Sequence, residues 1–74
     1  MSKKGELKRK IAESEEEIVL LEQKRGRSQS ALLEAIISNR QPDPTDVEYF
    51  KTFSQLIDLE RANWRKLKSE LDNL

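Results

Sequence analysis

Cysteine and histidine are absent from this sequence. The chain therefore forms no disulfide and offers no thiolate or imidazole to a zinc ion or to catalysis. Carboxylates remain, but Glu15, Glu16 and Glu17 are consecutive. On a helix they point in different directions and do not converge on a metal ion. We therefore expect no metal, no cofactor and no enzymatic activity.

Glycine, proline and aromatic residues are scarce. The 74 residues include two glycines, two prolines and 5% aromatics, whereas 38% of the residues are charged. Such a composition is poor in turn formers and typical of a coiled coil or long helix. A chain this short does not divide into two independently cored domains, so we expect residues 1–74 to form one helical unit.

Long hydrophobic runs are also missing. No apolar run approaches the roughly 20 residues that span a bilayer, and no apolar stretch follows the N-terminal lysines as it would in a signal peptide. We expect a chain with no membrane span and a cytoplasmic location. The lack of cysteine fits a reducing compartment.

Proline and turn-forming residues occur together at one place only, around Pro42 and Pro44. Both prolines disfavour helix at the preceding residue, and Asn39 suits a left-handed helix cap. The next helix starts either at Asp43, with Pro44 as its first residue, or at a capping box headed by Thr45, and we prefer Asp43. The sequence predicts an antiparallel all-α hairpin with helix one at about 3–39, a turn at about 40–43 and helix two at about 44–73.

Each predicted helix carries an apolar row with alternating steps of three and four residues, which is typical of a coiled-coil seam. In the second helix the row is almost entirely apolar, whereas in the first it has polar members. The first row is Leu7, Ile11, Ser14, Ile18, Leu21, Arg25, Ser28, Leu32 and Ala35, and the second is Phe50, Phe53, Ile57, Glu60, Trp64, Leu67, Leu71 and Leu74.

Folding at the predicted turn brings the two rows face to face. We expect a register in which Ile11 lies opposite Leu74 and Arg25 lies opposite Glu60. A charged pair inside a seam can fix the register, and arginine suits this role because its guanidinium can engage both carboxylate oxygens. In the alternative, both side chains extend from the edge of the seam into solvent.

Further apolar residues lie beside the seams and widen each stripe. Exposed contiguous apolar surface usually marks an interaction site, and a two-helix rod buries little surface by itself. We therefore expect a protein partner or a homodimer, with two hairpins pairing into a four-helix bundle. The residues assigned to this partner-binding stripe are Tyr49, Leu56, Leu59, Leu33 and Ile37.

The N-terminal segment is basic although the protein has a formal net charge of zero. In the expected register this segment extends beyond the end of the second helix and is available to bind an anion, nucleic acid included. The alternative is a solvated start of the first helix. The basic residues concerned are Lys3, Lys4, Lys8, Arg9 and Lys10.

These features predict a non-catalytic helical-hairpin interaction module, such as an adaptor, assembly factor or small chaperone. A small helical dimer that binds RNA or DNA through the basic segment is the alternative. In helix length and turn position the chain resembles small bacterial helical hairpins, including type III export proteins and RNA-binding dimers that control plasmid copy number. That resemblance implies a bacterial or phage interaction protein and assigns no role to any residue.

Overall fold

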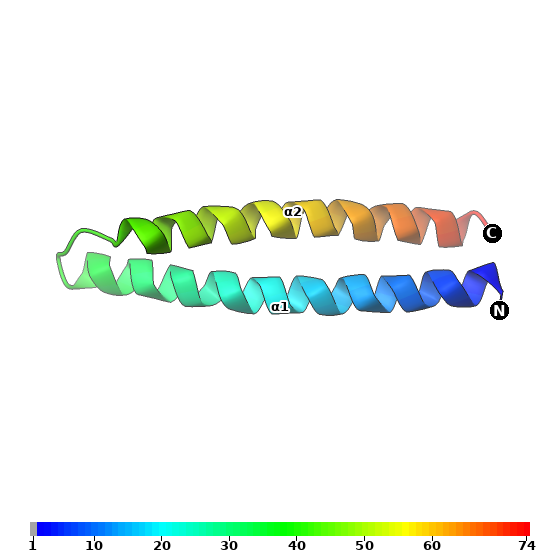
Figure 1. Ribbon diagram of the computed structural model, residues 1–74, viewed down its shortest axis with the longest axis horizontal. Coiled ribbons are helices and arrows are strands. Elements are labelled where there is room, and N and C mark those ends of the chain that lie inside the picture. The colour runs from blue at the N-terminus through cyan, green and yellow to red at the C-terminus, as the bar shows by residue number, and fades with distance from the viewer. Residues whose placement is uncertain (1) are drawn as a thin grey trace.

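The chain forms an antiparallel helical hairpin in the computed structural model, which describes residues 2–74. Helix α1 spans Lys3–Ile37 and helix α2 spans Pro44–Asp72. The rod measures 55 × 16 × 14 Å, with the turn at one end and the described N-terminal region beside the C-terminus at the other (Figure 1). The predicted all-α hairpin is confirmed. The pairing of two hairpins into a bundle stays a prediction.

The end of α1 has the geometry of a Schellman motif. Asn39 has a φ of 57°, and its N–H donates to the carbonyl of Ile36. The N–H of Arg40 donates to the carbonyl of Ala35 at 2.8 Å. These bonds satisfy carbonyls that the last helical turn leaves free, and asparagine tolerates the left-handed conformation better than most residues. The predicted cap is confirmed, and α1 ends two residues earlier than expected.

Helix α2 begins as preferred, at an Asp43 cap. The Asp43 side chain accepts a 2.8 Å hydrogen bond from the N–H of Thr45. Pro44 occupies the first helical position, where its missing N–H costs nothing and its fixed φ suits a helix. The chain therefore reverses over a short connector between the caps of the two helices.

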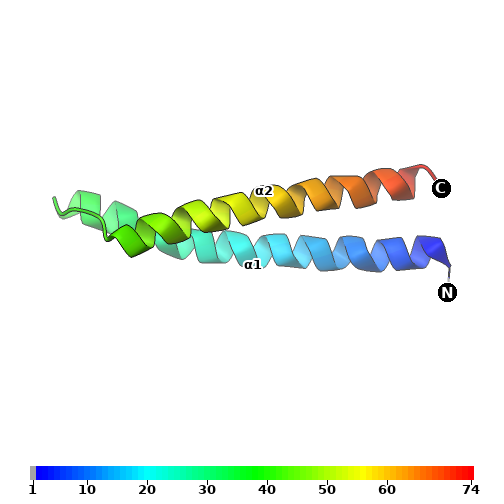
Figure 2. The same cartoon turned by 45° about the horizontal axis from the view of Figure 1, so that its top comes forward.

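The core is the seam between the helices, and its members are those that the heptad rows predict. All fully buried residues within the described chain belong to these rows, and Ile57 is completely inaccessible. Toward the turn, α2 passes in front of α1 (Figure 2), as expected for helices that coil around each other on a seven-residue repeat. The buried residues are Leu7, Ile11, Ser14, Leu21, Ser28, Ala35, Ile57 and Leu67.

The register between the rows differs from the expected one by about one heptad. Ile11 packs in one cluster with Leu67 and Leu7, whereas the expected register places Ile11 opposite Leu74. Leu74 itself is exposed. The expected register is therefore wrong, although the faces of both helices are right.

The turn explains the difference. Ala35, in the last turn of α1, shares a groove with Asp43 and Asp46 at the start of α2. The first turn of α2 thus packs beside the end of α1, whereas the expected register would place it beyond that end. Rows that repeat every seven residues face each other equally well after a slide of one heptad, so periodicity does not separate the two registers.

The slide gives the N-terminal segment a partner. Leu7 is buried against Leu67, and Leu71 packs on the same cluster. The expectation that this segment extends beyond α2 is therefore wrong, because α2 runs alongside it (Figure 1). Within residues 2–74, neither helix is long and apolar enough to cross a membrane.

Candidate interaction face

A polar group occupies the middle of the seam. The Ser14 hydroxyl donates a 2.8 Å hydrogen bond to Glu60 Oε2, and the Asn63 side-chain amide donates to the same oxygen, also at 2.8 Å. Among residues 2–74, Arg25 forms no salt bridge with Glu60. The expected pair is not formed, because the one-heptad slide moves Glu60 away from Arg25 and toward Ser14.

Two further interhelical polar contacts lie along one side of the rod, which we call the linked side. Arg61 Nη2 donates to Glu22 Oε1 at 3.1 Å, and the indole N–H of Trp64 donates to Glu15 Oε2 at 3.2 Å. The Lys68 ammonium stands 5.7 Å from the centre of the Trp64 ring. This side therefore uses its polar groups to join the two helices to each other.

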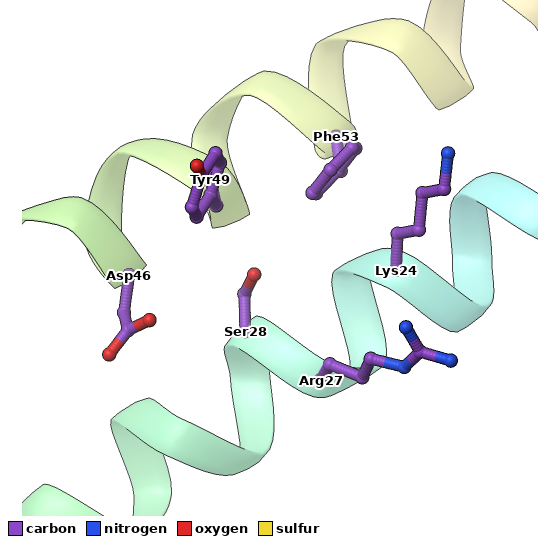
Figure 3. A pocket seen from close by; sticks show the side chains of 6 residues that line it. All are labelled: Lys24, Arg27, Ser28, Asp46, Tyr49 and Phe53. Carbon is purple, nitrogen blue, oxygen red and sulfur yellow. The ribbon is translucent and has the colours of Figure 1, made fainter.

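On the opposite side, two grooves flank the middle of the rod. The first, the turn-end groove, has a volume of about 410 Å³ and contains a stacked pair of rings, Tyr49 and Phe53, whose centroids are 6.0 Å apart. The buried Ser28 hydroxyl points toward these rings, and Arg27 runs along α1 away from them (Figure 3). Lys24, Arg27 and Asp46 complete the lining and give it a net positive charge.

The second groove, the open-end groove, has a volume of about 470 Å³ and lies nearer the chain termini. It contains the Ser14 and Glu60 hydrogen-bonded pair at its base. Three carboxylates and one ammonium group give the lining a net negative charge. The lining residues are Lys10, Glu13, Ser14, Glu17, Glu60, Asn63 and Leu67.

Three exposed leucines separate the grooves, and we call them the central leucines: Leu20, Leu56 and Leu59. Leu20 follows Glu17 by three residues and precedes Lys24 by four, so it lies on the α1 face that lines both grooves. Leu56 lies seven residues after Tyr49 and seven before Asn63, which line the two grooves. Leu59 follows Leu56 by three residues, so both leucines lie on the groove face of α2. Their side chains are 45%, 40% and 68% exposed. We call this side of the rod the groove face. From the open end to the turn, its surface is acidic, then apolar and then basic.

The structure divides the predicted partner-binding stripe. Tyr49, Leu56 and Leu59 lie together on the groove side of α2. Leu33 precedes Ile36 by three residues, and Ile36 follows Glu22 by two heptads, so Leu33 lies toward the linked side. Ile37 is the last residue of α1 and is 83% exposed. The five residues therefore do not form one continuous surface.

Leu20 belongs to the groove face, although the predicted stripe omits it. Its spacing of three and four residues from Glu17 and Lys24 is the signal that places it there. That signal gains meaning only when the position of α2 along α1 is known, because only then do Leu56 and Leu59 come to the same height as Leu20.

The predicted anion-binding residues are partly paired within α1. Arg9 forms a 2.7 Å salt bridge with Glu13, and Lys10 lies 3.5 Å from Glu6. Lys3, Lys4 and Lys8 are exposed. No group of acidic side chains in the described chain is arranged to hold a metal ion.

Comparison of this chain with protein-family models, with curated proteins and with solved structures finds no match in any of the three. The arguments for function consequently come from the geometry of the groove face and from the chemistry of its side chains.

Proposed function

We propose that this protein is a non-catalytic helical-hairpin module that works by packing its groove face against other helices. The observation that carries the proposal is the exposure of the three central leucines on one side of the rod. Exposed leucines that share one face of a helix pair offer the apolar surface against which a further amphipathic helix packs. The charged grooves on either side supply the polar rim of such an interface.

The internal seam supports the same proposal. Serine occupies two of its buried positions, Ser14 and Ser28, where a coiled coil would gain most from leucine or isoleucine. A hairpin with so narrow an apolar seam gains stability by burying a further face against a partner. Adaptor, assembly factor and small chaperone are roles that need only this kind of packing. A cytoplasmic location is part of the proposal, because a chain without cysteine needs no oxidising compartment.

A pull-down from the source cells with three versions of the chain tests the proposal. The wild type is expected to retain helical protein partners, its own untagged copies among them. L56S/L59S is expected to lose them, because two of the three central leucines become polar. V19S/L33S is the matched control, since Val19 and Leu33 are 54% and 50% exposed on other faces. Equal retention by all three versions would contradict the proposal.

Binding of RNA or DNA through the basic segment is the second candidate. The salt bridges of Arg9 and Lys10 with Glu13 and Glu6 weigh against it, because they neutralise two of the five cations. A phosphate-driven complex would weaken steeply as salt rises, with a slope set by the number of phosphates neutralised. Filter binding at two salt concentrations therefore separates this function from helix packing.

A further inference from the structure

We propose that the partner of the groove face is a second copy of this chain, docked in the antiparallel orientation. The inference rests on the proposed function and adds both the identity and the direction of the partner. In this arrangement a twofold axis passes through the central leucines, and the turn of each copy lies beside the open end of the other. Such an interface is isologous, which means that both copies use the same surface. Each residue therefore meets the residue of the other copy that lies equally far from the axis on its opposite side, and the two must be complementary.

The residues of α1 on the groove face meet this requirement. Leu20 lies in the middle of these residues. Glu13 and Glu17 precede Leu20, and Lys24 and Arg27 follow Leu20, with three or four residues between neighbours. An axis beside Leu20 brings Glu17 of one copy to Lys24 of the other, and Glu13 to Arg27. Each contact joins opposite charges and occurs twice in the dimer.

The side chains involved are accessible for this pairing. Within residues 2–74, neither Glu17 nor Lys24 forms a salt bridge inside the hairpin. Arg27 extends away from the aromatic pair of its own groove (Figure 3). Glu17, Lys24 and Arg27 therefore contact a second copy without first giving up an internal salt bridge, whereas Glu13 already has Arg9 as an internal partner at 2.7 Å.

The residues of α2 on the groove face are centred at the height of Leu20. Leu56 and Leu59 flank the axis, so the leucines of the two copies meet there. Tyr49 lies seven residues before Leu56 and Lys66 lies seven residues after Leu59. The axis therefore brings the Tyr49 ring of one copy to the Lys66 ammonium of the other, which is a favourable cation–π pair.

In the observed register, one twofold axis passes through the centre of the groove face on both helices. Glu17 and Asn63 lie at one height because both line the open-end groove, and Lys24 and Tyr49 lie at one height because both line the turn-end groove. Leu20 lies between Glu17 and Lys24 in the sequence, and Leu56 and Leu59 lie between Tyr49 and Asn63. The leucines at the centre of the groove face therefore lie at one height on both helices.

A parallel dimer lacks these charge pairs. With both turns at the same end, α1 of one copy faces α2 of the other, so Leu20 meets Leu56 and Leu59, whereas Glu17 comes to the height of Asn63 and Lys24 to the height of Tyr49. Neither the Glu17–Lys24 pair nor the Glu13–Arg27 pair forms in that arrangement. The opposite charges that meet across the antiparallel interface favour that orientation over the parallel one.

Cysteine substitutions test the orientation directly, because the chain has no cysteine of its own. E17C mixed with K24C under mild oxidation is expected to give a mixed disulfide dimer. E17C alone and K24C alone are the controls: the equivalent positions of the two copies lie about 10 Å apart along the rod, beyond the roughly 7 Å that a disulfide spans between Cα atoms. Absence of the mixed dimer, or equal cross-linking of each variant alone, would overturn the antiparallel arrangement.

Sedimentation equilibrium tests the dimer itself. The wild type and V19S/L33S are expected to be dimeric at about 100 µM, a concentration at which a micromolar complex is saturated, whereas L56S/L59S is monomeric with its helical circular dichroism retained. E17K is expected to raise the dimer dissociation constant about tenfold, and E17K/K24E to restore it. A monomeric wild type would overturn the inference, while retention of a different helical protein by the groove face would leave the proposed function standing.

Discussion

The Ser14 hydroxyl donates a 2.8 Å hydrogen bond to Glu60 Oε2 across the seam of the hairpin. Ser14 is buried and Glu60 is half-buried. A hydroxyl and a carboxylate at facing seam positions satisfy each other only in one register, because a slide of one heptad would place each of them against a different residue. The polar group therefore does what we expected of Arg25 and Glu60: it marks the register.

A double-mutant cycle on S14A and E60A measures this bond. E60A removes the acceptor of the buried Ser14 hydroxyl, and S14A leaves Glu60 Oε2 with the Asn63 amide alone, so we expect a coupling energy of about 1 kcal/mol in urea denaturation. The cycle with R25A and E60A is the control, and its effects should add to within about 0.5 kcal/mol. Strong coupling of Arg25 with Glu60 would contradict the observed register.

Leu7→Ala tests the packing of the N-terminal segment. Leu7 is 4% exposed in the cluster with Ile11 and Leu67, so its truncation should lower the free energy of unfolding by about 2–3 kcal/mol. Leu33→Ala removes a half-exposed side chain and should change the free energy of unfolding by less than about 0.5 kcal/mol. Both are measured by urea denaturation at one protein concentration. Equal, small effects would mean that the segment extends freely.

Gly26→Ala should stabilise the protein. Gly26 lies inside α1 with ordinary helical φ, and an added Cβ would meet no atom within 4 Å. Replacing glycine by alanine in a helix interior gains about 0.5–1 kcal/mol, which a thermal melt detects as a higher midpoint. Gly5→Ala is the comparison, since its Cβ would lie 3.2 Å from the capping Ser2 Oγ. A smaller gain is expected there.

Substitutions at Asn39 test the cap of α1. With φ at 57°, Asn39→Ala places a Cβ in the left-handed region and should cost about 1 kcal/mol. Asn39→Gly removes that Cβ and should leave the stability equal or higher. Urea denaturation distinguishes the two variants. The same loss in both would show that the Asn39 side chain, and not its backbone conformation, matters.

Local features of the fold were predictable because their causes are local. Asn39 and Asp43 act within a few residues of themselves, through a left-handed backbone and a side-chain hydrogen bond to Thr45. Pro44 acts through its fixed φ. Such signals need no knowledge of the distant chain, so the sequence predicts the helix ends to within about two residues.

The candidate site was only partly predictable. Helical spacing assigns Leu56 and Leu59 to one face, and these residues do lie together. The same reasoning grouped Leu33 with them, although Leu33 lies toward the linked side. Which faces of α1 and α2 form one surface depends on how the helices pack, and spacing within one helix contains no such information.

The scarcity of turn formers and the two heptad rows determined that this chain is a hairpin and which residues lie in its seam. Tertiary structure alone decided how far α2 slides along α1. A seven-residue repeat is compatible with several slides, and the turn at Ala35 to Asp43, the burial of Leu7 and the bond between Ser14 and Glu60 select one of them. That slide brings Leu20 to the height of Leu56 and Leu59 and so creates the face on which the proposed dimer depends.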